Sequence, residues 1–490
     1  MLDKLRNRLL AFIASDKDTP LLAGFAVGLY MMLFYYSKNF ALANSWQQLL
    51  FFTGYYLLLP AATLFIVQKV MGILKLFAYI RHFLFTGTAL FFVFFFLQLI
   101  NDTFPFILFS VIAFGVAILS IWLKNYYKAF IPLLLIMCVF NIKPLAGVAY
   151  KSIVASDEWK KLPDDIESVH FLTKPNVYYI QPDGYTSFRN FRENPNCLFD
   201  NDEYVRFLKA TGFTLYDDYR SNYVSTLLSN SATFAMKHHY IAMDVEAYGA
   251  RRIITESNPV LRIFKNNGYK TSFITEKAYL VMNRPQGGYD YCNITNNELP
   301  YIKDGLDTDR DIFTDLKTQV AKNTVSGNFY FIEKLQPTHI TNSKGNSTGI
   351  EGEKKIYMQG VRSANNWLEQ IVNFINVNDP GAIIIIGADH GGYTGLSCTA
   401  DSTSKITDRG LINSIFGAQL AIKWGDPQYA QYDSGLRSGV NLFRTLFSFL
   451  AKDKKYLQHT EENGSYIKLH NPAGVYRYID DKGNTVFEKP

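Results

Sequence analysis

Two short stretches of the chain end apolar runs with side chains that can bind metals. Asp183 follows residues 177–180, and Asp389 and His390 follow the isoleucines at 383–386. Carboxylate oxygens and an imidazole nitrogen form a ligand set suited to Zn²⁺ or Mn²⁺. Each stretch alone has an ordinary alternative, because an aspartate beside glycine is also common in a structural turn. The two together predict a metal site if the fold brings them close.

A third stretch, residues 220–226, places a hydroxyl before an expected helix. It reads Arg-Ser-Asn-Tyr-Val-Ser-Thr, and the residues after Thr226 are compatible with a helix. A helix N-terminus presents N–H groups and partial positive charge, which stabilise a phosphate or a sulfate. Thr226 would lie in that field, although a hydroxyl is also an ordinary helix cap.

A sheet with helices between its strands is expected to position these residues. After residue 172, runs rich in β-branched and aromatic residues alternate with amphipathic segments, which predicts a doubly wound, mostly parallel α/β sheet. Ligands bind at the carboxyl ends of such strands, so Asp183 and Asp389 are expected at one edge. The expected strands are 177–180, 270–275, 328–335 and 382–386, and the expected helices are 202–212, 258–267 and 353–375.

The first part of the chain is apolar enough to cross a membrane several times. One span needs about 20 predominantly apolar residues. A removable signal peptide is not expected, since further apolar runs follow the first one. We predict a membrane domain at 1–150, a linker or juxtamembrane helix at 151–172 and a catalytic domain at 173–490. The five expected spans are Pro20 to Tyr36, Trp46 to Val67, Phe83 to Ile100, Phe104 to Leu123 and Phe130 to Val148.

Basic residues predict the side of the membrane on which the domain at 173–490 lies. They gather before the first span, between the second and third, and between the fourth and fifth, which the positive-inside rule assigns to the cytoplasm. With five spans the domain is then exported. Cys197, Cys292 and Cys398 allow one disulfide there without fixing its partners. The formal net charge of +6 is spread over loops and domain, so no nucleic-acid-binding surface is expected.

Four further basic side chains have ordinary explanations. His238 and His239 are adjacent and would point to different sides of a helix, so at most one contacts a substrate and surface placement is expected. Arg220 and Lys277 could contact an anionic group, but solvated charge is the usual state of such residues.

Taken together, the Asp-Gly strand end, Ser-Asn-Tyr-x-x-Thr and Ala-Asp-His-Gly resemble the membrane-bound sulfatase-like proteins of the alkaline phosphatase superfamily. Five spans before an exported α/β domain also resemble the lipoteichoic acid synthases and the lipid A phosphoethanolamine transferases. The resemblance covers nearly the whole chain, and the ordered combination is more specific than any single motif. It implies an α/β alkaline-phosphatase or sulfatase-like fold for residues 173–490.

The resemblance also implies a role for each residue. Asp183, Thr226, Asp389 and His390 match the metal-binding set, and Thr226 Oγ1 would also attack phosphorus to give a phosphothreonine intermediate. His339 resembles the histidine that holds a phosphoryl oxygen or protonates the leaving group, although a structural or surface histidine fits equally well. The implied cofactor is one divalent metal, Zn or Mn.

The chain departs from the family pattern at several points. Transferases and synthases of this kind carry a glutamate where this chain has Asp183, which is closer to the sulfatases. Cys197, Cys292 and Cys398 all lack the Cys/Ser-x-Pro-x-Arg signature for formylglycine, so conventional sulfatase activity is disfavoured. An Asp-x-x-x-His pair for a second phosphatase metal is also missing from the sequence.

These observations lead to one functional hypothesis and two alternatives. The hypothesis is a multi-pass enzyme of the bacterial cytoplasmic (inner) membrane, with its catalytic domain on the periplasmic or extracellular side. It would transfer phosphoethanolamine or phosphoglycerol from a phospholipid donor to a cell-envelope glycan acceptor. The alternatives are a metal-dependent phosphodiesterase or sulfatase-like hydrolase, and a non-catalytic membrane scaffold.

Overall fold

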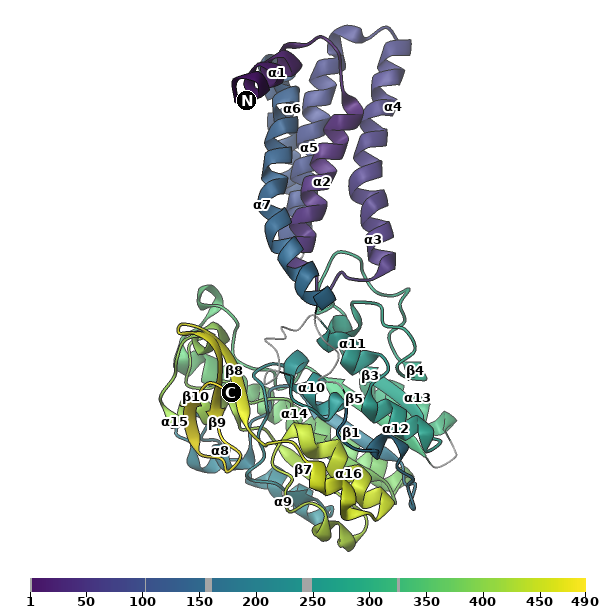
Figure 1. The fold of residues 1–490 in the computed structure, drawn as a ribbon, viewed down its shortest axis with the longest axis vertical. Helices are drawn as coiled ribbons and strands as arrows, with labels where there is room; N and C mark the ends of the chain where they lie inside the picture. The colour runs from purple at the N-terminus through teal and green to yellow at the C-terminus, as the bar shows by residue number, and fades with distance from the viewer. Residues whose placement is uncertain (1, 102, 155–160, 240–248, 324–326) are drawn as a thin grey trace. The chain divides into compact units, whose positions relative to one another are not determined.

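The computed structural model of the chain describes residues 2–101, 103–154, 161–239, 249–323 and 327–490 (Figure 1). The chain forms two compact units. The first contains Met1–Val154 and the short segment Pro300–Asp304, and the second contains Ala155–Leu299 and Gly305–Pro490. Residues 155–160 of the predicted linker lie outside the described residues, so the linker boundaries remain a prediction.

The first unit is helical and carries the apolar segments. Among the described residues, four stretches are long and apolar enough to cross a membrane: Pro20–Asn39, Trp46–Ile73, Phe77–Ile100 and Phe106–Tyr150. The last, at 45 residues, exceeds the length of one span and contains two helices, α6 and α7, joined by the 3₁₀ turn Lys124–Tyr126. The helices are α1 (Leu2–Ala14), α2 (Pro20–Asn39), α3 (Trp46–Phe52), the π-helix Thr53–Leu58, α4 (Leu59–Ile73), α5 (Ile80–Ile100), α6 (Phe106–Leu123) and α7 (Tyr127–Val154).

Three predicted cytoplasmic stretches meet at one end of this helical unit, through contacts of two basic residues. The Arg81 guanidinium donates to Asp16 Oδ1 at 3.3 Å and to Asn125 Oδ1 at 3.3 Å. The Lys128 ammonium donates to the Ser15 carbonyl at 2.6 Å. The stretches before α2, before α5 and after α6 therefore lie on the same side, as the positive-inside pattern requires.

The second unit is built on a seven-stranded sheet with the order β2-β7-β6-β1-β5-β3-β4. Neighbouring strands in the run from β6 to β4 are parallel, whereas β7 is antiparallel to both β6 and β2. The predicted mostly parallel α/β sheet is confirmed, because every expected strand and helix is present. The strands are β1 (Val177–Pro182), β2 (Thr214–Leu215), β3 (Lys270–Thr275), β4 (Tyr291–Cys292), β5 (Asn328–Lys334), β6 (Ile383–Gly387) and β7 (Leu420–Lys423).

Helices cover both faces of this sheet (Figure 1). On one face, rings of α10, α12 and α16 pack on the strands, as in the contacts of Tyr179 with Phe234 and Phe443. On the other face lie α9, α13 and α14, where Phe313 packs on Phe374. The helices of this unit are α8 (Phe188–Glu193), α9 (Asp202–Ala210), α10 (Thr226–Ala235), α11 (Ala250–Thr255), α12 (Pro259–Asn266), α13 (Ile312–Lys322), α14 (Ile350–Asn378), α15 (Arg409–Phe416) and α16 (Leu442–Ala451).

A small antiparallel sheet near the C-terminus was not expected from the sequence. It consists of β8 (Ser465–His470), β9 (Ala473–Ile479) and β10 (Thr485–Glu488), in the order β10-β9-β8. Ile467 and Leu469 of β8 share a hydrophobic core with Ile340, Tyr393 and residues of α15. The small sheet therefore supports the loops that follow β5 and β6.

Helix α10 packs along the end of β1, and the spacing of its contacts matches the spacing of the strand residues that it contacts. Phe234 contacts Tyr179, with ring centroids 6.3 Å apart, and Thr226 Oγ1 donates to Asp183 Oδ1 at 2.9 Å. Eight residues of helix rise about 12 Å, and four residues of strand rise about 13 Å. The two contacts are therefore separated by nearly the same distance along the helix and along the strand. Asn230 of α10 and Gln181 of β1 lie midway between the two contacts.

The cysteines of the structure are free thiols. Cys138, Cys197 and Cys398 are buried, and Cys292 is partly buried. The Cys197 Sγ contacts the Thr394 hydroxyl at 2.9 Å, so it belongs to the packing of the loop after β6.

Candidate metal and phosphoryl-transfer site

The four residues predicted for the metal set come together at the carboxyl edge of the sheet. Asp183 follows β1, and Asp389 and His390 follow the neighbouring strand β6. One ligand atom each from Asp183, Asp389 and His390 lies within 4.8 Å of the others, and all three residues are buried. Thr226 begins α10 and donates to Asp183 Oδ1 at 2.9 Å. Four groups from three elements therefore converge on one point.

The turn after β1 depends on a close backbone approach at Gly184. Its φ is +66°, and a Cβ atom there would lie 2.5 Å from the Thr338 carbonyl oxygen. The Gly184 N–H donates to Asp389 Oδ1 at 3.0 Å. Tyr357 of α14 accepts from the Thr186 N–H and donates to the Gly184 carbonyl. Glycine is therefore needed to join the two strand ends through the backbone.

The donor atoms suit a divalent cation. His390 Nδ1 donates to the Gly391 carbonyl at 2.8 Å, which leaves the Nε2 lone pair for a metal. Asp389 Oδ2 is buried without a hydrogen-bond partner among the described residues. A buried carboxylate oxygen without a partner is costly, and a cation would satisfy it. Two carboxylates, one imidazole and a hydroxyl match the ligands that Zn²⁺ or Mn²⁺ accepts.

The pKa shifts of the cluster residues also favour a bound cation. Burial and the nearby Asp183 carboxylate raise the pKa of Asp389 to about 6. Burial alone would lower the pKa of His390, but the Asp389 and Asp183 carboxylates raise it above the usual value. Negative charge is thus concentrated among buried side chains, which is a condition under which a cation binds well.

His339 lies beside this cluster, on the loop after β5. Its ring centroid is 5.7 Å from that of His390 and 6.0 Å from that of Tyr393. The Nδ1–H group donates to the Ile340 carbonyl, so Nε2 carries the free lone pair. Burial and the neighbouring His390 lower the pKa of His339. A neutral imidazole in this position is better suited to accept a proton than to donate one.

Three buried polar residues near the cluster were missed in the sequence. Gln181 and Glu333 are register partners at the ends of β1 and β5, and Asn230 lies one turn after Thr226 in α10. Both amide atoms of Gln181 and Asn230, and Glu333 Oε1, have no partner among the described residues. The spacing of Thr226 and Asn230, four residues apart before a helical run, was the signal that could have found one of them.

Glu333 is the most unusual member of this group. It is 1% exposed, and Thr275 donates to Glu333 Oε2 at 2.5 Å. Burial, together with the charges of Asp183 and Asp389, raises its pKa well above the usual value. The side chain is therefore expected to hold its proton.

We expect Asn230→Leu to separate stability from activity. Its amide has no partner and is 1% exposed, so an apolar side chain of similar size removes an unsatisfied group. The melting temperature is expected to stay equal or to rise. Turnover is expected to fall by about tenfold if the amide contacts the phosphoryl group or its ordered water. Differential scanning fluorimetry and a phosphodiester assay measure both, and a fall in both together contradicts the expectation.

The prediction of surface positions for His238 and His239 is wrong. The two residues are 4% and 1% exposed. They follow α10, which ends at Ala235, and are therefore not on the helix that the prediction assumed. His238 Nε2 contacts the Glu462 carbonyl at 2.6 Å, and His239 stacks on Tyr223 with centroids 4.3 Å apart.

Arg220 and Lys277 are also held by protein groups. The Arg220 guanidinium donates to the carbonyls of Asn463, Asp480 and Asp481 at 3.0 Å each. Lys277 Nζ lies 3.7 Å from Asp309 Oδ1. Arg220 is 6% exposed and is therefore not the solvated charge that the sequence suggested.

Acid is expected to destabilise the domain through His239. Burial lowers the pKa of this imidazole from 6.5 to about 4. The unfolded state thus binds a proton that the folded state excludes, and stability present above pH 6.5 is lost as the pH falls toward 4. The full effect is about 3 kcal/mol. Thermal melts between pH 7 and pH 4.5 measure it. His239→Gln is expected to melt lower at pH 7 but to show a shallower pH dependence, and an equal slope contradicts this.

Comparisons with known proteins were made over the whole chain. No protein-family model matches it, and no curated protein matches it. Solved structures do match, and they include phosphoethanolamine transferases and a sulfatase. Because these structures have low identity to this chain and low TM-scores, a functional assignment rests on the residues of the site and not on the structural likeness.

Three of these structures show the range. The integral membrane phosphoethanolamine transferase EptA of Neisseria meningitidis is 14% identical, with 70% of this chain and 68% of that chain covered and a TM-score of 0.42. The periplasmic domain of EptC from Escherichia coli, solved in complex with Zn, is 13% identical, with coverages of 59% and 86% and a TM-score of 0.39. The sulfatase-type protein yidJ of Bacteroides fragilis is 12% identical, with coverages of 62% and 83% and a TM-score of 0.38.

Proposed function

We propose that this protein is a membrane-bound phosphotransferase that moves a phosphate-linked head group from a phospholipid to a cell-envelope glycan. The observation that carries the proposal is the contact of Thr226 Oγ1 with Asp183 Oδ1 at 2.9 Å, next to the buried ligand set Asp183, Asp389 and His390. A hydroxyl held against metal-binding carboxylates is an arrangement for nucleophilic attack on phosphorus. The motif resemblance to sulfatase-like transferases agrees with it.

In the first half-reaction, Thr226 Oγ1 attacks the phosphorus of the donor lipid. The Thr226 O–P bond forms as the hydroxyl gives up its proton, the O–P bond to diacylglycerol breaks, and the diacylglycerol oxygen takes up that one proton, so charge and protons balance. Asp183, Asp389 and His390 would hold a divalent cation, which would supply positive charge that makes the threonine hydroxyl more acidic. No side chain among the described residues caps the start of α10, so its N–H groups remain available to the phosphoryl oxygens.

In the second half-reaction, the acceptor hydroxyl attacks the phosphothreonine. The new O–P bond forms on the glycan, and the bond to Thr226 breaks, which restores the free hydroxyl. His339 Nε2 would accept the proton of the attacking hydroxyl, because its pKa is lowered and its Nδ1–H is already bonded to Ile340. Water in place of the glycan would give hydrolysis by the same residues.

The apolar helices favour a lipid donor. The helical stretches Pro20–Asn39, Trp46–Ile73, Phe77–Ile100 and Phe106–Tyr150 exceed what a single membrane anchor needs. An enzyme held in the bilayer meets phospholipids by diffusion in two dimensions. We place it in the cytoplasmic membrane of a bacterium with the catalytic domain exported, as the positive-inside pattern predicts.

Labelled donor lipids test the proposal. Purified protein in lipid nanodiscs is incubated with phosphatidylethanolamine or phosphatidylglycerol that carries a labelled head group. The expected result is release of diacylglycerol with the label on Thr226, followed by loss of label when a glycan is added. Absence of both signals with every donor would refute transfer. Mass spectrometry of envelope glycans from deletion and wild-type cells identifies the head group and the acceptor together.

A further inference from the structure

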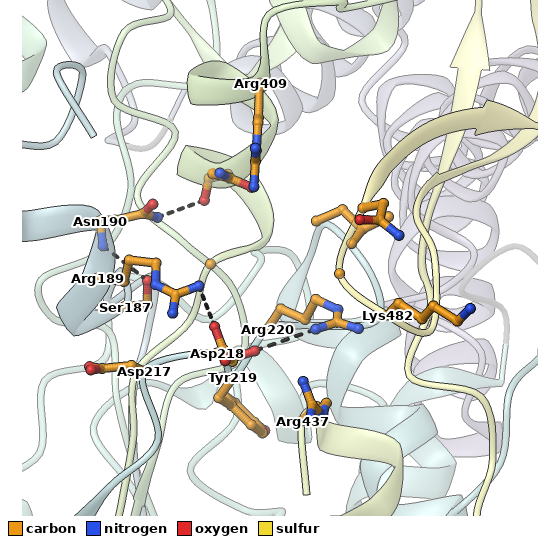
Figure 2. Close-up of a pocket in the computed structure, with 15 residues that line it drawn as sticks. Ser187, Arg189, Asn190, Asp217, Asp218, Tyr219, Arg220, Arg409, Arg437 and Lys482 are labelled. Carbon is orange, nitrogen blue, oxygen red and sulfur yellow. Dashed lines mark hydrogen bonds and ion pairs between the residues drawn. The ribbon is translucent and has the colours of Figure 1, made fainter. Parts of the chain in front are cut away.

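A polar pocket lies in the second unit (Figure 2), and the residues that line it do not include Asp183, Asp389 or His390. It has a volume of about 280 Å³. Its walls come from α8, the segment 217–220, α15, Arg437 and the turn between β9 and β10. The residues that line it include Ser187, Arg189, Asn190, Asp217, Asp218, Tyr219, Arg220, Arg409, Asn413, Arg437, Lys482 and Asn484.

The charges around this pocket do not balance. Asp217 is paired with Arg192 at 2.9 Å, and Asp218 is paired with Arg189, so both carboxylates are already neutralised. Among the described residues, the exposed guanidinium groups of Arg409 and Arg437 have no carboxylate partner. The pocket therefore offers uncompensated positive charge to a ligand.

The cations are spread along the pocket. Figure 2 shows Arg409 above and Arg437 below, with Arg189 and Arg220 at heights between them, while Lys482 extends away from this group. The Arg220 guanidinium donates to backbone carbonyls, so its side chain is held in place at the base of the pocket. Burial and the neighbouring Arg437 lower the pKa of Arg220, and the carboxylates of Asp481, Asp218 and Asp480 offset part of this effect.

The shape and chemistry of the pocket restrict its ligand. Drug-sized ligands occupy pockets of roughly 300–1,000 Å³, so this one fits a smaller unit. Ile479 and the buried Tyr219 are its apolar side chains, which leaves no wall for an acyl chain. Guanidinium groups bind phosphate or carboxylate through two parallel hydrogen bonds, and the asparagine and serine groups nearby suit hydroxyls.

The pocket is close to the proposed site of transfer. Ser187 lines it and lies four residues after Asp183, a stretch of chain that spans at most about 14 Å. The Gly417 carbonyl at its wall accepts from the Ser187 N–H at 3.2 Å and from Thr186 Oγ1 at 3.2 Å. A short oligosaccharide is long enough to reach from one place to the other.

We propose that this pocket binds a phosphorylated or carboxylated sugar of the glycan acceptor, with Arg409 and Arg437 as the groups that recognise its charge. The inference rests on the proposed function for the identity of the acceptor, but binding can be measured without transfer. Both arginines are exposed, so their substitution is expected to leave the fold intact.

The test uses the full chain in nanodiscs and glucose 6-phosphate as the probe. The variant is Arg409→Gln with Arg437→Gln, and the control is Arg206→Gln with Lys209→Gln, which removes the same charge from the exposed face of α9. Isothermal titration calorimetry is expected to show at least a tenfold weaker affinity for the variant, and no change for the control. Binding of the probe to the metal cluster is common to all proteins and cancels in this comparison.

Two further ligands and one activity assay serve as controls for this binding experiment. Glucose is expected not to bind, and inorganic phosphate is expected to bind more weakly than glucose 6-phosphate. Equal affinity of the variant and the wild type, or equal affinity for phosphate and sugar phosphate, overturns the proposal. Hydrolysis of bis(p-nitrophenyl) phosphate is expected to survive in the variant, while transfer to glycan is lost. If wild-type protein releases no diacylglycerol from any labelled donor and takes up no label on Thr226, the proposed function fails, while the binding result still stands or falls by itself.

Discussion

Thr226→Ala is expected to abolish head-group transfer, with a fall of about 10³-fold or more in turnover. In the proposed mechanism the residue supplies the oxygen that forms the covalent bond to phosphorus, and no other described hydroxyl donates to Asp183 Oδ1. The measurement is release of diacylglycerol from labelled phospholipid, together with mass spectrometry of the peptide that contains position 226.

The matched control is Thr226→Ser, which keeps the hydroxyl at the start of α10. It is expected to retain turnover within about tenfold of wild type and to carry the label on serine. Metal content and melting temperature are expected to change little in Thr226→Ser. Thr226→Ala removes one of the four proposed ligands but keeps Asp183, Asp389 and His390, so it is expected to be folded. Full activity of Thr226→Ala would show that water or another group attacks phosphorus directly.

Removal of divalent metal is expected to eliminate activity and to lower the melting temperature. Among the described residues, Asp389 Oδ2 is buried without a hydrogen-bond partner, close to the Asp183 carboxylate and 3.4 Å from His390 Nε2. Repulsion and desolvation in the empty site amount to a few kcal/mol, and a cation that binds the folded state alone restores this stability by mass action. Scanning calorimetry before and after chelation, followed by addition of Zn²⁺ or Mn²⁺, measures the effect.

His390→Gln is the variant that tests whether the metal acts at the proposed position. It keeps a polar side chain but removes the imidazole lone pair that faces Asp183 and Asp389. Chelation is expected to shift the melting temperature of the wild type by several degrees and to shift that of the variant much less. An identical shift in both proteins would place the stabilising metal elsewhere in the chain.

The sequence was sufficient for the elements that carry the metal ligands. The apolar runs of β1 and β6 are followed by Asp-Gly and Asp-His-Gly, respectively. Parallel strands bring such ends to one edge of a sheet. The prediction of helix α10 after Thr226 followed from ordinary propensity. These features are local in the sequence, which is why they could be predicted.

The features that were missed depend on contacts between distant segments. Gln181 and Glu333 meet through the register of β1 and β5, which a single sequence does not reveal. The burial of His239 depends on stacking with Tyr223 and on the end of α10 at Ala235. The pocket of Arg409 and Arg437 requires the turn between β9 and β10, in a sheet that the sequence did not suggest.

The bond between the Gly184 N–H and Asp389 Oδ1 joins positions 205 residues apart. The chain is synthesised from its N-terminus, so β1 is made before both of its neighbours, β5 and β6. The ligand set can form only after these two strands have been made. Contacts of such long range form late in folding. The proposed ligand set is therefore incomplete in a shortened chain. A truncation before position 389 is expected to take up no cation at this site, however well its first strands are formed, so metal uptake would report that synthesis is finished.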